Sequence, residues 1–185
     1  MSVVEFSAWP KTPRLFRDIV VTEKIDGTNA CVIVTDNGEV HAQSRTRLIT
    51  ASDDNFGFAA WVESNKDALA AKLGEGHHFG EWWGRGVQRG YGLDTRIFSM
   101  FNVTRWAGEY ESLNEIPGLR LVPVLYQGVF DECAIRYAVT KLRQSGSVAS
   151  PAWLKPEGVV VFHTASRQVY KVLLENDEIP KGAAG

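Results

Sequence analysis

The sequence predicts an α+β fold in which antiparallel β-sheets carry flanking helices. Apolar residues recur at helical spacing in two segments of the chain. Most of the remaining chain consists of short runs of β-branched and aromatic residues, which favour strands. Glycines are spread along the length and no Ser/Pro-rich linker interrupts it, so we expect a single domain over residues 1–185.

A β-hairpin is expected near the N-terminus. Residues 30–35 and 39–45 are strand-like runs around an Asn-Gly pair, which is typical of a tight type I′ turn. With Asn37 and Gly38 as the two turn residues, Arg45 is expected to pair across from Ala30. Arg45 would then lie beside the loop that precedes the first hairpin strand.

Two helices are expected, over residues 58–73 and 132–144, because their apolar residues form one stripe each. Both segments are flanked by candidate caps and stops: Asp53 or Asp54 and Gly74 for the first, Asp131 and Gly146 for the second. The remaining strands are expected over residues 77–83, 96–103, 119–129, 158–163 and 168–174.

The composition is that of an ordinary globular protein, with 44% hydrophobic and 23% charged residues. The chain has no membrane-length apolar run and no signal-peptide pattern, so we expect a cytoplasmic protein without membrane contact. Cys31 and Cys133 lack CxxC spacing and are expected to be reduced thiols that pack as small apolar residues. The net charge of -2 provides no global positive field, so any nucleic-acid contact would depend on a local basic face.

A lysine lies at the end of an apolar strand, in the sequence Lys24-Ile-Asp-Gly. Alone, this short pattern is weak, and a surface turn would explain it. Further segments follow it in a fixed order: Arg45 in Gln-Ser-Arg-Thr, Glu81 in Gly-Glu-Trp-Trp-Gly-x-Gly-x-Gln, the run Phe98 to Val103, Glu157 in Pro-Glu-Gly, and Lys171 in the last predicted strand.

This ordered set resembles the six nucleotidyltransferase motifs of the covalent-lysine superfamily of polynucleotide ligases and RNA capping enzymes. It is most similar to the ATP-dependent RNA ligase branch that includes phage-type double-strand RNA ligases and RNA-editing ligases. The similarity covers residues 20–174, and the stretch around Glu81 is its most branch-specific part. The resemblance implies an ATP-grasp-like nucleotidyltransferase fold. It also implies a nearly minimal adenylyltransferase, without a separate OB or C-terminal clamp domain.

The resemblance also implies residue roles. Lys24 would carry AMP, Glu81 would bind a ribose hydroxyl, and Phe101 would stack on adenine. The implied catalytic set is Lys24, Glu157 and Lys171, with Glu157 near Mg²⁺ or Mn²⁺. The implied nucleotide-binding set is Glu23, Ile25, Asn29, Arg45, Glu81, Phe101 and Lys171. The chemistry agrees, because a lysine amine attacks the α-phosphorus of ATP only in its neutral form, and the developing phosphoryl charge requires cations.

Several residues have alternative interpretations. Phe98 is expected in the core, and core packing is an alternative for Phe101 as well. A cluster of arginines after the glycine turn is suited either to nucleic-acid phosphates or to a solvated surface: Arg85, Arg89 and Arg96. His77 and His78 point to opposite faces of a strand and have no partner at zinc-site spacing, so no zinc site is expected.

Two positions depart from the family pattern. Leu173 stands where the last motif commonly has a second lysine on the same strand face, and Asn102 stands where many relatives carry aspartate. Loss of one cation at a buried phosphate removes a few kcal/mol of transition-state stabilisation. Arg167 and Lys155 are the candidates to replace the missing charge.

The leading hypothesis is an ATP-dependent RNA ligase that joins RNA ends in a nicked duplex or broken strand. We expect a monomer, and an accessory protein could supply part of the RNA-binding surface. A DNA ligase on the same core is one alternative, and a capping-type guanylyltransferase is another. Leu173 raises a further alternative, a catalytically weak module that binds nucleotide or RNA ends.

Overall fold

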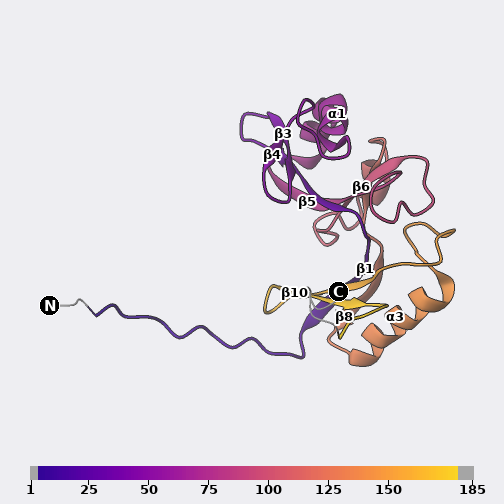
Figure 1. Cartoon of the computed structure of the whole chain (residues 1–185). Coiled ribbons are helices and arrows are strands. Elements are labelled where there is room, and N and C mark those ends of the chain that lie inside the picture. Colours follow the sequence, from indigo (N-terminus) through magenta and orange to yellow (C-terminus); the bar gives the residue numbers. More distant parts are fainter. Residues whose placement is uncertain (1–3, 179–185) are drawn as a thin grey trace.

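The computed structural model describes residues 4–178 and contains two β-sheets (Figure 1). The four-stranded sheet has the order β10-β9-β1-β8, with β1 (Asp18–Lys24), β8 (Val124–Val129), β9 (Gly158–His163) and β10 (Gln168–Leu173). The six-stranded sheet has the order β4-β3-β2-β5-β6-β7, with β2 (Thr28–Val34), β3 (Val40–Ser44), β4 (Leu48–Ile49), β5 (Gly76–Gly84), β6 (Arg96–Met100) and β7 (Leu119–Leu121). The α+β class is confirmed, although β6 and β7 are parallel and the sheet is therefore mixed.

Both expected helices are present, as α1 (Phe58–Leu73) and α3 (Glu132–Ser145), and a short α2 (Tyr110–Leu113) was not predicted. The N-cap of α1 is Gly57, so the predicted cap at Asp53 or Asp54 is wrong. Asp54 lies three residues earlier, and its carboxylate accepts hydrogen bonds from the backbone N–H groups of Ala59 (2.8 Å) and Ala60 (3.0 Å). The Asp131 carboxylate accepts one from Cys133 (2.8 Å), as expected of an N-cap. None of the helices in residues 4–178 has the length and apolar character that a membrane crossing requires.

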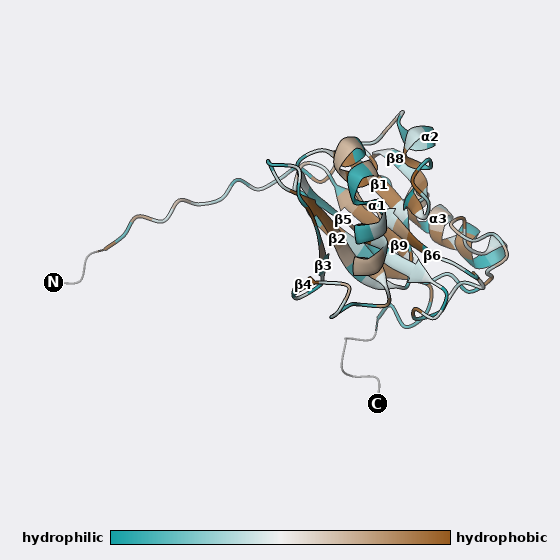
Figure 2. Cartoon of the chain, turned by 90° about the horizontal axis from the view of Figure 1, so that it is seen from above, coloured by the Kyte–Doolittle hydropathy of each residue, from teal (hydrophilic) through white to brown (hydrophobic). Residues whose placement is uncertain are grey.

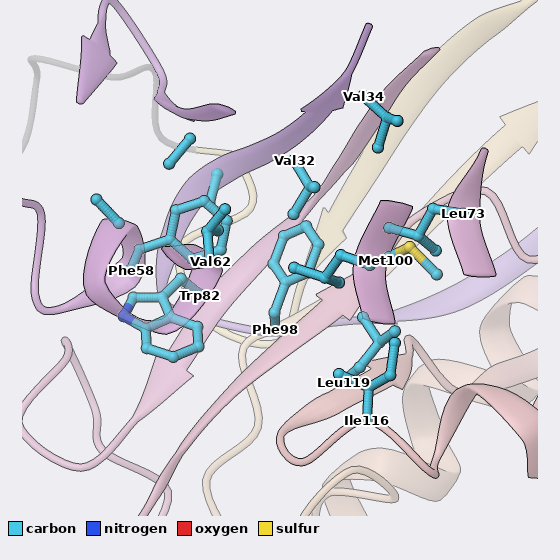
Figure 3. Close-up of a cluster of buried hydrophobic side chains, with 14 of the residues drawn as sticks. Val32, Val34, Phe58, Val62, Leu73, Trp82, Phe98, Met100, Ile116 and Leu119 are labelled. Atoms are coloured by element: carbon cyan, nitrogen blue, oxygen red, sulfur yellow. The ribbon is translucent and has the colours of Figure 1, made fainter. Parts of the chain in front are cut away.

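Each helix covers one face of a sheet. In Figure 1, α1 lies with the six-stranded sheet and α3 lies with the four-stranded sheet. The α1 core centres on Phe58, whose ring lies 5.3 Å from that of Trp82 and 5.0 Å from that of Phe98 (Figure 3). The α3 core packs Ala138 and Leu142 on apolar residues of β1 and β9. The hydrophobic colouring of β1 and β2 in Figure 2 agrees with these buried faces.

Replacement of Phe58 by alanine is expected to lower the free energy of unfolding by about 3–5 kcal/mol, because it removes a fully buried ring and leaves a cavity. Chemical denaturation measures this change. Phe6→Ala is the matched control, since Phe6 is 93% exposed and its loss should change stability by less than about 0.5 kcal/mol. Equal effects of the two substitutions would contradict the packing described here.

In chain order, all strands of the six-stranded sheet come between β1 and β8, which are neighbouring strands of the four-stranded sheet. The chain leaves β1 after Lys24 and returns to β8 through Val122 and Pro123. These two connections lie side by side, because the Glu23 N–H donates to the Pro123 carbonyl at 2.9 Å. The single strand predicted over 119–129 is therefore wrong: it is two strands, one in each sheet. Proline has no N–H with which to continue a ladder.

The hairpin has a different register from the expected one. Its loop spans residues 36–38, and Gly38 adopts φ 83°, as in a type I turn followed by a bulge. Ala30 therefore pairs with Ser44, and the predicted pairing with Arg45 is wrong. The Asn-Gly pair fits both turn types, and the extra loop residue shifts the register by one. Arg45 lies exposed just beyond the end of β3.

The cysteines and histidines have structural roles. Both cysteines are free thiols, but Cys31 is buried while Cys133 is exposed on α3, so the expected burial is right only for Cys31. His78 is buried and its ring contacts the Gly74 carbonyl at 2.9 Å. Within residues 4–178, no group of three or more His, Cys, Asp or Glu side chains is arranged to hold a metal ion.

Candidate active site

A cavity of about 650 Å³ lies between the two sheets. Side chains alternate along a strand, so every second residue of β1, β9 and β10 faces it. The four-stranded sheet contributes Val20, Thr22, Lys24, Val160, Phe162 and Val169, and the six-stranded sheet and the segment after β6 contribute His77, Phe79, Glu81 and Phe101 to Trp106. A mostly apolar cavity of this size with a few convergent polar groups is typical of a small-molecule site.

Lys24 lies at the end of β1 and contacts a carboxylate from another strand end. Its Nζ atom lies 2.5 Å from Oε2 of Glu157, and the two side chains are only 25% and 17% exposed. The strand register places Lys24 opposite Gly158 of β9, directly after Glu157. A Cβ atom at position 158 would overlap the Val172 carbonyl, so this position requires glycine.

Glu81 joins the lysine loop to the six-stranded sheet. Its Oε1 accepts a hydrogen bond from the Gly27 N–H (3.0 Å), and its Oε2 accepts one from Asn29 Nδ2 (3.2 Å). Burial raises the pKa of Glu81 to about 7, while the positive charge of Lys24 opposes the shift. Gly27 packs so closely on β5 that an added Cβ would lie 2.5 Å from the Trp82 carbonyl oxygen. Gly27 of the lysine motif and Glu81 of the Gly-Glu-Trp-Trp motif are therefore in direct contact.

The raised pKa of Glu81 predicts a pH-dependent stability. Between pH 4.5 and about 7 the folded state holds the Glu81 proton more tightly than the unfolded state, so the free energy of unfolding falls as pH rises. The shift corresponds to about 3 kcal/mol. Glu81→Gln is expected to remove this part of the pH dependence, measured by urea denaturation at pH 5 and pH 8. The exposed Glu39→Gln is the control, and identical pH profiles for wild type and Glu81→Gln would contradict the prediction.

The Glu23 carboxylate faces away from the cavity, toward the connection after α3. Its Oε2 accepts hydrogen bonds from the backbone N–H groups of Val148 (2.8 Å) and Ala149 (2.9 Å). Burial raises the pKa of Glu23, and its Oε1 has no partner within residues 4–178. Glu23 also belongs to the lining of the cavity, although its carboxylate is bonded on the other side of β1. Ile25 is buried in the cluster between the sheets and also lines the cavity.

Asp26 organises the outer side of the lysine loop. Its Oδ2 accepts a hydrogen bond from Arg89 Nε (2.8 Å), and its N–H donates to the Tyr91 hydroxyl (2.9 Å). Arg89 also donates through Nη1 to the Lys155 carbonyl (3.0 Å). Sequence reasoning missed these supports, because Arg89 and Tyr91 reach Asp26 from a loop more than sixty residues away.

The three arginines after the glycine turn are not equivalent. Arg89 lies beside the lysine loop, whereas Arg96 donates from Nε to the Arg85 carbonyl at 2.9 Å. Arg85 itself is exposed. The prediction that these three residues contact nucleic-acid phosphates stays a prediction.

The two phenylalanines lie in different surroundings. Phe98 is fully buried in the α1 core, whereas Phe101 lines the cavity and is 43% exposed. The ring of Phe101 is therefore partly accessible at the cavity. Asn102 also lines the cavity, and its Oδ1 accepts a hydrogen bond from the Arg105 N–H at 3.2 Å.

Lys171 lies exposed on β10, opposite Val160, on the cavity face of the four-stranded sheet. Leu173 lies opposite Gly158, in the same cross-strand row as Lys24. A second cavity of about 230 Å³ adjoins this row and is lined by Arg89, Pro156, Glu157, Leu173, Glu175 and Asn176. Neither Arg45 nor Lys171 is among the residues that line these two cavities.

Several cavity residues were not predicted from the sequence. His77 and Phe79 lie on the same strand face as Glu81, so the period-2 alternation of β5 could have identified both. Thr104, Arg105 and Trp106 follow β6 in irregular structure, and no periodicity pointed to them.

A family model described as RNA ligase matches residues 17–173. Among solved structures, a mutant of Naegleria gruberi RNA ligase with AMP and manganese matches with TM-score 0.63 and 18% identity, covering 86% of this chain and 50% of that one. Another mutant of the same protein, with ATP and manganese, matches with TM-score 0.64 and 19% identity, covering 87% and 51%. The chain thus spans about half the length of these structures, and at this identity the likeness shows the fold. Comparison with curated proteins finds no match.

Proposed function

The chain belongs to the RNA ligase family, and from this membership we propose that it is an ATP-dependent RNA ligase that carries AMP on Lys24. One observation carries the proposal: Lys24 borders a nucleotide-sized cavity and contacts the Glu157 carboxylate at 2.5 Å. In this proposal the base lies near Phe101, and the ribose hydroxyls lie near Glu81.

The first step forms a covalent intermediate. The lone pair of neutral Lys24 Nζ attacks the α-phosphorus, a P–N bond forms, and the P–O bond to pyrophosphate breaks. In this proposal Glu157 accepts the proton that Nζ gives up, and the contact between its carboxylate and that atom supports this role. Lys171, on the cavity face of β10, adds positive charge for the phosphoryl oxygens.

The residues beside Lys24 fit a hard divalent cation. The second cavity offers the carboxylates of Glu157 and Glu175 and the amide of Asn176, which are oxygen donors of the kind Mg²⁺ and Mn²⁺ prefer. Mg²⁺ commonly binds through one or two carboxylates together with substrate phosphates. When bound, the cation would neutralise charge on the phosphate oxygens.

The later steps of the proposal act on RNA. AMP passes from Lys24 to a 5′-phosphate, and an adjacent 3′-hydroxyl then displaces AMP to form the phosphodiester. Because the net charge is -2, RNA contact depends on local cations such as Arg85. The proposal also includes an accessory protein that supplies part of the RNA-binding surface. The free thiols of Cys31 and Cys133 favour a cytoplasmic location in this proposal. A monomer is part of the proposal as well.

Covalent labelling with α-³²P-labelled ATP and Mg²⁺ tests the proposal. We expect a protein-bound AMP that is lost on addition of pyrophosphate, and little label from GTP. Matched nicked duplexes that differ only in RNA or DNA at the 3′-hydroxyl strand then separate an RNA ligase from a DNA ligase. Absence of covalent AMP with both Mg²⁺ and Mn²⁺ would refute the proposed ligase activity. ATP binding without formation of covalent AMP would indicate a nucleotide-binding module.

A further inference from the structure

The row of residues that contains Lys24 has no cation at its far end. Lys24, Gly158 and Leu173 lie opposite one another on three adjacent strands, so Leu173 lies about 10 Å from Lys24 across the sheet. Leucine cannot neutralise a phosphate. Among the described residues 4–178, the 230 Å³ cavity beside this row is lined by one positive side chain, Arg89, together with Glu157 and Glu175.

Arg89 is held in place but keeps donors for a ligand. It bonds Asp26 through Nε and the Lys155 carbonyl through Nη1, which uses two of the five N–H groups of a guanidinium. Three N–H groups therefore have no hydrogen-bond partner within residues 4–178. These two hydrogen bonds orient the side chain, which is 35% exposed, before a ligand arrives.

The two other candidates are less suitable. Lys155 reaches this region through its backbone carbonyl, which holds Arg89. Arg167 precedes β10 and lies six residues from Leu173, about 20 Å along an extended strand. Of these three residues, only Arg89, from the loop between β5 and β6, is among the described residues that line the cavity.

We propose that Arg89 is a catalytic residue that binds the β- and γ-phosphates of ATP, in place of a lysine at position 173, and that Asp26 positions it. This inference rests on the proposed function. A guanidinium presents parallel N–H donors that match phosphate oxygens. The 230 Å³ cavity is then the site of the pyrophosphate leaving group, beside the carboxylates suited to the divalent cation.

The experiment measures the rate of Lys24 adenylylation against ATP concentration, and the affinity for Mg²⁺-pyrophosphate by calorimetry. Arg89→Ala is expected to lower the adenylylation rate about 100-fold and to weaken pyrophosphate binding. Leu173→Lys in the Arg89→Ala protein is expected to restore at least about 10-fold of that rate. Arg136→Ala is the matched control, because Arg136 pairs with Glu132 on α3, away from both cavities.

The outcomes separate the two proposals. An unlabelled wild-type protein would refute the proposed function itself. If the wild type is labelled, wild-type rates and pyrophosphate affinity in Arg89→Ala would overturn the role of Arg89. Loss of activity that Leu173→Lys fails to rescue would also overturn it, because Arg89 would then only support the loop. Recovery by Leu173→Lys supports the proposal, since a lysine on β10 restores the charge and not the contacts to Asp26 and Lys155.

Discussion

Lys24→Arg is expected to abolish covalent AMP labelling, with a loss of more than about 1,000-fold in rate. The arginine keeps the positive charge and can still contact Glu157, which lies 2.5 Å from Lys24 Nζ in the wild-type protein. A guanidinium is not deprotonated in proteins, however, so no nucleophile is available to attack phosphorus. Single-turnover labelling with α-³²P-labelled ATP measures the loss.

The matched control is Lys141→Arg, which makes the same change on α3 outside both cavities. Its labelling rate should equal that of the wild type. Peptide mapping of the labelled wild-type protein should place AMP on Lys24. A label that persists in Lys24→Arg, or that maps to Lys171, would show that the nucleophile is wrongly assigned.

Gly27→Ala is expected to lower the adenylylation rate about 100-fold, because a displacement of about 1 Å in a reacting group can cost that much. The added methyl would lie 2.5 Å from the Trp82 carbonyl oxygen and 2.8 Å from Trp83 Cβ, so the lysine loop has to move off β5. The hydrogen bond from the Gly27 N–H to Glu81 then lengthens, and Lys24 moves with it.

The control for a general effect of glycine loss is Gly128→Ala on β8. A methyl there meets only the flexible end of the Tyr126 side chain, so activity should stay close to that of the wild type. Thermal denaturation of both variants checks that they fold. Full activity of a folded Gly27→Ala protein would show that the contact between the loop and β5 does not position the lysine.

Local sequence patterns predicted the helices and strands of this fold better than they predicted which strands pair with one another. The spacing of apolar residues and Gly74 at the C-terminal end predicted the bounds of α1, because these depend on residues within one or two turns. The N-cap is Gly57 and was not predicted. The two sheets could not be separated in the same way: residues 119–129 are continuously strand-forming, and only Pro123 marks the passage from one sheet to the other. The hairpin register depended on one extra loop residue, which the Asn-Gly pair does not specify.

The motif order predicted correctly that Lys24 and Glu157 come together, although they are 133 residues apart. It did not predict the direction of the Glu23 carboxylate, because strand alternation turns the residue before Lys24 to the opposite face. Nor did it predict that Arg89 lies beside Leu173, since a loop conformation with Gln88 and Tyr91 at positive φ brings it there. Long-range side-chain contacts of this kind leave no periodic pattern in a sequence.

The paired connections between the two sheets give Lys24 a special mechanical position. Both connections pass from one sheet to the other at the same place, where the Glu23 N–H donates to the Pro123 carbonyl. A rotation of one sheet against the other would pivot there, and residues near a pivot move least. Lys24 is the next residue, whereas Phe101 and Phe162 line the cavity on the two separate sheets, farther along it. Such a rotation would open or narrow the cavity as a nucleotide enters or leaves. Lys24 would move very little during this change.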